Sequence, residues 1–199
     1  MPKVSRSYLH AKRFRILSAA AVCFSLQGFH RATMQDIVRQ SQLSPGAIYN
    51  YFESKEKIIE AIAAERLARQ KELFAQAKTE APIVDTLKRI RNAFLGELKS
   101  PKERLRRRVS IQLWAEAQRN PRILRLIRRS VEAPRRLLAE LLANAQRRGE
   151  IHEDVDPGAA AGFLVATFHG LALQVEWDRR FDLEPHDQLL DRFLETISR

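Results

Sequence analysis

Residues 33–55 read TMQDIVRQSQLSPGAIYNYFESK, and this stretch decides the fold of the N-terminal part of the chain. Thr33 and Ser44 are residue types that cap helix N-termini, and Pro45 suits the first turn of a helix. The stretch therefore predicts two short helices, separated by a tight turn at residues 41–43. Two helices at this spacing are typical of a helix-turn-helix, in which the first helix braces the second in the major groove of DNA.

The second of these helices has one apolar side and one small or polar side. Ile48 and Phe52 are spaced to pack against the first helix, together with Ile37, Val38 and Leu43. Small residues at the N-terminus of the second helix let its backbone approach a duplex, and the free N–H groups there favour phosphate. From this pattern we expect ten residues to face DNA: Thr33, Gln35, Ser44, Pro45, Gly46, Ala47, Tyr49, Asn50, Tyr51 and Lys55.

Several of these residues also have a structural interpretation that the sequence leaves open. Thr33 is a helix cap whether or not it touches phosphate, Tyr49 and Tyr51 are large enough for the core, and Asn50 suits a solvated helix surface. Lys55 lies in the first turn of the following helix, where its positive charge opposes the helix dipole. A bound phosphate would relieve that opposition, and we therefore expect Lys55 to contact one.

The charge of the chain points in the same direction. The 199 residues carry a net charge of +11, with a pI of about 10.4. Such a surface attracts nucleic acid or an anionic membrane, although charge also serves solubility alone. Basic residues near the N-terminus are candidates for contacts with flanking phosphates or the minor groove, with a solvated tail as the alternative: Lys3, Arg6, Lys12, Arg13 and Arg15.

Outside this stretch, apolar residues recur at spacings of three and four, and strand signals are scarce, which predicts an all-α fold. Gly28 marks the C-terminal stop of the first helix. The remaining helices are expected at about residues 11–27, from 55 onward, between Pro82 and Pro101, at 102–118, 123–148 and 157–178, and after Pro185.

Several classes of protein are disfavoured by the composition. The single cysteine, Cys23, precludes an intrachain disulfide and lies among apolar residues, which predicts a buried thiol. We find no Gly-rich phosphate loop and no Ser-centred nucleophile turn, and the five histidines are scattered, so we expect no enzyme activity, no cofactor and no metal. No apolar N-terminal segment and no run long enough to span a membrane is evident, so we expect a cytoplasmic protein without membrane contact.

The stretch from Phe14 to Ile62 resembles the DNA-binding domain of the TetR family of bacterial regulators. The matching residues stand in one fixed spacing: Ala19, Ala20, Phe24, Gly28, Phe29, Thr33, Met34, Asp36, Ile37, residues 44–52, Ser54 and Lys55. The resemblance implies DNA contacts at Thr33, Ser44, Gly46, Ala47, Tyr49, Asn50 and Lys55. It also implies a homodimer on a near-palindromic operator of double-stranded DNA, with repression relieved by a small-molecule effector.

One position departs from the family pattern. The turn between the two helices holds Gln42 where the family has glycine. If the backbone is left-handed there, glutamine costs roughly 1–2 kcal/mol. The departure bears on the docking geometry of the turn and leaves the predicted fold unchanged.

The C-terminal half resembles the BetI-like subgroup of that family, in the segments 113–117, 120–121, 154–157 and 169–172. The predicted architecture is therefore an N-terminal three-helix helix-turn-helix domain at residues 1–55 plus a C-terminal helical ligand-binding and dimerisation domain at residues 56–199. Candidate pocket residues, for each of which core packing is the alternative, are Phe94, Gln112, Trp114, Phe163, Phe168, His169 and Trp177. With two tryptophans, an aromatic cage for a quaternary ammonium ligand is a further option.

Small residues four apart in the stretch 157–178 let another helix approach closely. Packing within the chain is one interpretation, and a four-helix dimer interface with the last helix is the one that the resemblance favours. The expected interface residues are Gly162, Ala166, Gly170, Leu190, Phe193 and Ile197.

These observations predict a sequence-specific DNA-binding transcriptional regulator. The favoured interpretation is a repressor that a small molecule releases from its operator. The alternative is a DNA-binding regulator or architectural protein without ligand control. A third class, a protein-interaction scaffold, would show no sequence-specific binding to DNA.

Overall fold

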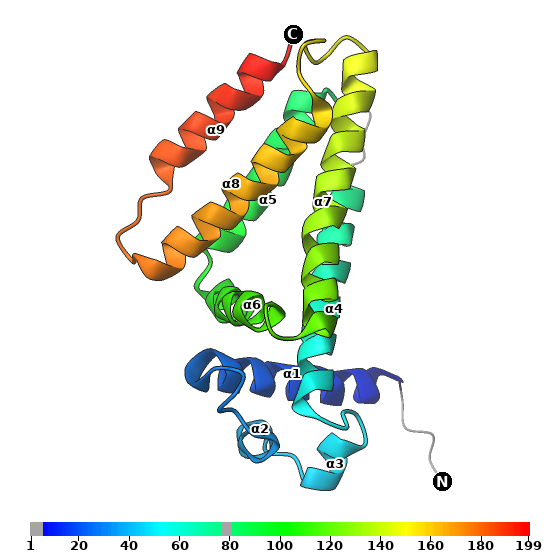
Figure 1. Ribbon diagram of the computed structural model, residues 1–199, viewed down its shortest axis with the longest axis vertical. Coiled ribbons are helices and arrows are strands. Elements are labelled where there is room, and N and C mark those ends of the chain that lie inside the picture. The colour runs from blue at the N-terminus through cyan, green and yellow to red at the C-terminus, as the bar shows by residue number, and fades with distance from the viewer. Residues whose placement is uncertain (1–5, 77–80) are drawn as a thin grey trace. The chain divides into compact units, whose positions relative to one another are not determined.

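The computed structural model describes residues 6–76 and 81–199, and within them every element of regular structure longer than a single bridge is a helix, as predicted (Figure 1). The elements are α1 (Arg6–Gln27), α2 (Met34–Ser41), α3 (Pro45–Tyr49), α4 (Lys55–Gln76), α5 (Ile83–Lys99), a short 3-10 turn (Pro101–Glu103), α6 (Arg104–Ala117), α7 (Pro121–Arg147), α8 (Pro157–Trp177) and α9 (Glu184–Ile197).

The chain divides into two compact units that interleave along the sequence. The first unit comprises Met1–Arg66 and Leu105–Ile127, and the second comprises Leu67–Arg104 and Arg128–Arg199. These units do not coincide with the sequence-based boundary between residues 55 and 56. Helix α4 continues without a break past that point, and part of α6 belongs to the core of the first unit.

The core of the first unit is built from the apolar sides of α1, α2 and α3, with residues of α4 and α6. Phe24, Ile37 and Ile48 are fully buried in it, and Phe52 is 6% exposed. The predicted packing side of the helix-turn-helix is therefore confirmed for these residues. Cys23 is buried in the same core, as expected, and burial raises the pKa of its thiol.

In the second unit, α5 packs against α8 and α9, with residues of α7 in the shared core (Figure 1). Leu138, Leu142 and Leu194 are almost completely buried there. Among the described residues, α8 alone is long and apolar enough to cross a membrane by length and composition, a feature that the sequence analysis did not expect. Leu164 and Leu171 on one side of α8 are buried, whereas Phe163 on the other side is 51% exposed. The apolar composition of α8 is thus shared between the core and an exposed surface.

Candidate nucleic-acid interface

Helix α2 begins with a complete capping box. The Thr33 hydroxyl accepts a hydrogen bond from the Asp36 amide at 3.2 Å, and the Asp36 carboxylate accepts from the Thr33 amide at 2.9 Å. Hydrogen bonds from Thr33, and a weaker contribution from Arg39, lower the pKa of Asp36 to about 2. Thr33 and Gln35 are both exposed. The cap therefore fixes the start of the brace helix and leaves these two predicted contact residues accessible.

Helix α3 has its predicted cap and its predicted exposed tip. The Ser44 hydroxyl accepts a hydrogen bond from the Ala47 amide at 3.2 Å, and Pro45 occupies the first turn. Gly46 has open space where a Cβ would stand, and Tyr49 is 52% exposed. Further exposed or half-buried residues of the tip and its flank are Ser44, Pro45, Ala47, Asn50 and Tyr51. Only the apolar side of α3 is sealed inside the unit, so its polar side is accessible to a duplex.

The turn between α2 and α3 has a left-handed residue. Gln42 has φ 54° and ψ 33°, and it is the non-glycine residue with positive φ in the described part of the chain. A steric cost of glutamine was expected only if the backbone is left-handed at this position, and the structure confirms the left-handed conformation. The Gln42 side chain is exposed, and its Oε1 accepts a hydrogen bond from Arg15 at 3.3 Å.

The structure gives Lys55 a different partner from the predicted phosphate. Its ammonium Nζ donates to the backbone carbonyls of Phe29, His30 and Ala32 at 2.9, 3.0 and 3.2 Å. It also lies 4.8 Å from the centre of the Phe29 ring. An ammonium has three N–H donors, and these three carbonyls use all of them. In this structure Lys55 holds the loop between α1 and α2, and none of its side-chain donors is left for a phosphate.

The same loop is held from a second side by α6. His30 Nε2 lies 2.7 Å from Glu116 Oε2, and the Glu116 side chain is only 8% exposed. Gly28, the predicted stop of α1, adopts φ 78°. Sequence reasoning missed both the His30–Glu116 pair and the carbonyl contacts of Lys55, because nothing in the local pattern indicates which distant backbone or side chain meets these groups.

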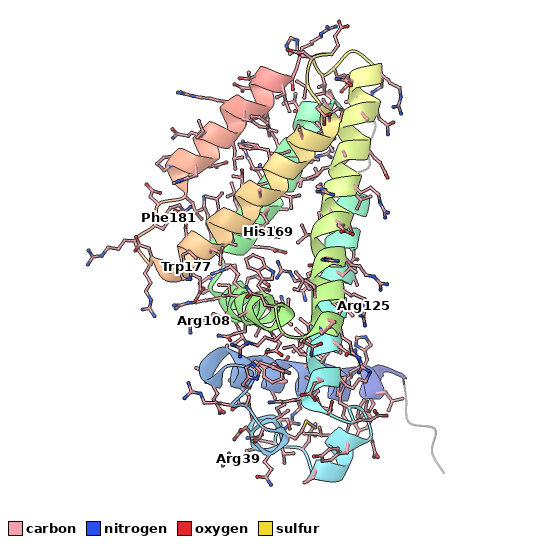
Figure 2. All side chains as sticks on the ribbon, viewed as in Figure 1. Arg39, Arg108, Arg125, His169, Trp177 and Phe181 are labelled. Atoms are coloured by element: carbon pink, nitrogen blue, oxygen red, sulfur yellow. The ribbon has the colours of Figure 1, made fainter. Side chains whose placement is uncertain are left out.

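The basic residues of α1 are partly engaged within the first unit. Lys12 lies 4.6 Å from the centre of the Tyr8 ring, and Arg13 pairs with Glu65. Lys3 and the side chain of Arg6 lie outside the described residues. On α2, Arg39 pairs with Asp36 across one turn, and 78% of its side chain is exposed (Figure 2).

Comparison with known proteins agrees with this geometry. Residues 16–62 match the family model "Bacterial regulatory proteins, tetR family", and residues 84–199 match "BetI-type transcriptional repressor, C-terminal". The chain belongs to the TetR family. It is a DNA-binding transcriptional regulator of the repressor class, with a BetI-type C-terminal domain, and the resemblance inferred from residues 14–62 and from the C-terminal segments is confirmed.

Relatives of this TetR-family regulator support the assignment along most of the chain. The HTH-type transcriptional regulator UidR of Escherichia coli is 28% identical over 168 residues, which cover 82% of this chain and 81% of UidR. The structure of GusR from Salmonella enterica has a TM-score of 0.78 at 29% identity and covers 98% of both chains. A transcriptional regulator from Saccharomonospora viridis, solved in complex with choline, has a TM-score of 0.81 at 25% identity and covers 96% of this chain and 99% of that one.

The predicted pocket residues of the regulator are divided between the two compact units. Phe94 and Phe168 stack in the core of the second unit, with ring centres 4.4 Å apart. Phe163 is 51% exposed and Trp177, on the same helix as His169, is 72% exposed, so neither lines an enclosed cavity (Figure 2). Gln112 and Trp114 belong to the other unit. Beside Phe168, residues of α5, α7, α8 and α9 line a cavity of about 10 Å³, roughly the space of one water molecule.

The predicted interface residues divide into two groups. Ala166 is exposed on α8, where Gly162 and Gly170 are half-buried, and Phe193 of α9 packs beside the exposed Phe163 with ring centres 4.7 Å apart. Leu190 and Ile197 are only 4% and 7% exposed, because they point into the core of their own unit. These two residues are a correction to the predicted interface, and the exposed leucine of α9 is Leu189.

Proposed function

We propose that the chain is a homodimeric repressor that inserts α3 of each protomer into the major groove of a near-palindromic operator. The observation that supports this most directly is the N-terminal tip of α3, which is capped by Ser44, open at Gly46 and exposed at Tyr49. Small residues at such a tip suit close approach to a duplex. The proposed DNA-facing residues are Thr33, Gln35, Ser44, Pro45, Gly46, Ala47, Tyr49, Asn50 and Tyr51, with Lys55 as a residue that positions them.

The proposed dimer uses the exposed apolar side of α8 and α9. Phe163, Ala166 and Leu189 are exposed there on a helix pair whose opposite side forms the core of the second unit. An isologous contact between two copies would bury these side chains and set the two reading helices at a fixed spacing on DNA. Phe163→Glu should yield monomers by sedimentation velocity, whereas Gln118→Glu, at an exposed position between α6 and α7, should leave the dimer intact. If Phe163→Glu still forms dimers at the concentrations at which the wild-type protein is dimeric, this interface is refuted.

The proposed effector is a small molecule that enters the second unit. The cavity beside Phe168 has a volume of about 10 Å³, far below the 300–1,000 Å³ or so of a typical ligand site, so a ligand would fit at this position only in a form in which the surrounding core has opened. A ligand that binds the opened form more tightly than the closed form shifts the population toward the opened form. The size of this shift is limited by the difference between the two affinities. Choline, which is bound by the relative from Saccharomonospora viridis, is a reasonable first compound to test. We further propose that the protein is cytoplasmic and has no enzyme activity.

The test begins with a duplex selected by the wild-type protein from a random-sequence pool. Binding to this labelled duplex is measured by fluorescence anisotropy for wild-type, Tyr49→Ala, Asn50→Ala and the control Gln118→Ala. We expect both variants of α3 to weaken binding and the control to leave it unchanged. Failure to recover any preferred sequence, or equal affinity for all four proteins, would refute the proposed interface.

Ligand control is tested on the same complex. Compounds that raise the melting temperature of the free protein are added to the protein–DNA complex, and release of the duplex is followed. Stabilisation with release supports an effector-controlled repressor. A thorough screen in which no stabilising compound releases DNA favours the alternative, a regulator without ligand control.

A further inference from the structure

A strained residue and an uncompensated charge meet at the turn of the helix-turn-helix. Gln42 adopts φ 54° and ψ 33°, a conformation in which a side chain carries a steric penalty that glycine avoids. The glutamine side chain is exposed and takes no part in the core. Its recorded contact is with Arg15, whose Nη2 donates to Gln42 Oε1 at 3.3 Å. Gln42 thus combines the steric penalty of a left-handed backbone with a polar side-chain contact at the surface, to Arg15.

Arg15 is available to a further partner. It is exposed on α1, and in the described part of the chain its side chain has no hydrogen bond or ion pair besides the one to Gln42. Its neighbour Arg13 differs, because that guanidinium is paired with Glu65. A guanidinium has five N–H donors and no acceptor, so the contact with Gln42 leaves most of its donors directed to solvent.

The contact also fixes the orientation of the Gln42 side-chain amide. Because Oε1 accepts from Arg15, the amide nitrogen of Gln42 is left as a donor beside the guanidinium. The pair therefore offers a full positive charge and several N–H groups at one exposed point. A planar guanidinium with a neighbouring amide donor suits an oxyanion with several acceptor oxygens, such as a phosphodiester.

We propose that Arg15 and Gln42 form a phosphate-binding pair for the DNA backbone, in which Gln42 positions the guanidinium of Arg15. The inference rests on the proposed function. When a helix-turn-helix places its second helix in the major groove, its first helix crosses the DNA backbone. Gln42 is the C-cap of that first helix, α2, so this docking would bring the pair near the backbone. The pair then contacts a phosphate of that backbone in a manner independent of base sequence.

The test is a double-mutant cycle on Arg15→Ala, Gln42→Gly and the combined variant, with Arg125→Ala as the control. Arg125 is an exposed arginine of α7 (Figure 2) that forms no hydrogen bond or ion pair with the described residues. Its replacement by alanine removes the same charge as Arg15→Ala. The probe is the labelled duplex selected by the wild-type protein, titrated at several salt concentrations. Melting temperatures are measured for each variant.

Arg15→Ala should raise the dissociation constant several-fold and reduce the salt slope by about 0.9 per protomer, whereas Arg125→Ala should leave the slope unchanged. Arg15→Lys, which keeps the charge, should keep most of the slope. Gln42→Gly should raise the melting temperature and yet weaken binding, so a folding defect is not the cause. In the Arg15→Ala background, Gln42→Gly should have no further effect on affinity.

Two results would overturn the pair. One is an equal salt slope for Arg15→Ala and Arg125→Ala, which would mean that Arg15 touches no phosphate. The other is a loss of affinity on Gln42→Gly that is the same with and without Arg15, which would mean that Gln42 does not act through it. Failure of the wild-type protein to bind any duplex would refute the proposed function instead, and the two failures are therefore distinguishable.

Discussion

Replacing Lys55 by methionine tests whether this residue holds the α1–α2 loop or binds DNA. The ammonium donates to three carbonyls at 2.9, 3.0 and 3.2 Å, and two of them belong to the buried residues Phe29 and Ala32. Hydrogen bonds to a charged group contribute about 1.5–3 kcal/mol each at most. Lys55 is half-buried, and water can replace part of these contacts in the variant. We therefore expect Lys55→Met to lower the free energy of unfolding by about 2–4 kcal/mol in total.

The measurement is urea unfolding followed by circular dichroism. At an m-value of about 2 kcal/mol per molar urea, a loss of this size moves the midpoint by about 1–2 M. Lys57→Met is the matched control on the same helix. Lys57 pairs with Glu60 one turn away at 3.2 Å, and such exposed pairs contribute about 0.5 kcal/mol or less.

DNA binding separates the two roles of Lys55. If Lys55 acts through the loop, Lys55→Met weakens binding to the selected duplex but leaves its salt slope intact, because no phosphate contact is lost. The reasoning is refuted if Lys55→Met unfolds at the same urea concentration as Lys57→Met while the salt slope falls by about 0.9 per protomer.

Three further predictions concern the same unit and a matched glycine elsewhere. Gly28→Ala should destabilise the protein by roughly 1–2 kcal/mol, because φ is 78° at this position. Gly96→Ala inside α5, where an added Cβ meets open space, should stabilise the protein by roughly 0.5–1 kcal/mol. Thermal melts should therefore show a lower melting temperature for the first variant and a higher one for the second. The lowered pKa of Asp36 makes its stabilisation present above about pH 4 and lost as the pH falls toward 2, so wild-type and Asp36→Asn should converge in melting temperature over that window. His30→Ala leaves the buried carboxylate of Glu116 without its partner and should cost about 1 kcal/mol, which Glu116→Gln in the same background should partly restore in urea unfolding.

The parts of the fold that sequence reasoning predicted correctly depend on neighbours within one helical turn. Thr33 and Ser44 cap helices because each hydroxyl meets an amide three residues later, and Gly28 ends α1 because of its own backbone conformation. The pattern of Ile37 and Ile48 repeats at helical spacing, so the side that packs is visible without any tertiary information. Local chemistry was sufficient for the helix-turn-helix and for the exposed tip of α3.

The partners of long polar side chains could not be predicted in the same way. Lys55 stands at a helix N-terminus, and the argument from the helix dipole correctly identified a charge that needs compensation. Its partners are carbonyls 23 to 26 residues earlier, which the fold brings to it only through the packing of α1. The His30–Glu116 pair joins residues even farther apart in sequence. A flexible side chain has many possible partners, and only the tertiary structure selects one.

The exposed surface of α9 shows how small a rotation separates a correct assignment from a wrong one. Successive residues of an α-helix are turned by about 100°, so Leu189 and Leu190 point in clearly different directions. Leu189 is 66% exposed and Leu190 is 4% exposed, although both suit an apolar interface by composition. The apolar residues of α8 and α9 supply both the core and an exposed side, and an apolar pattern that serves two surfaces does not by itself say which leucine serves which. Burial in the folded protomer resolves this, because it assigns Leu190 to the core and leaves Leu189 exposed on the surface.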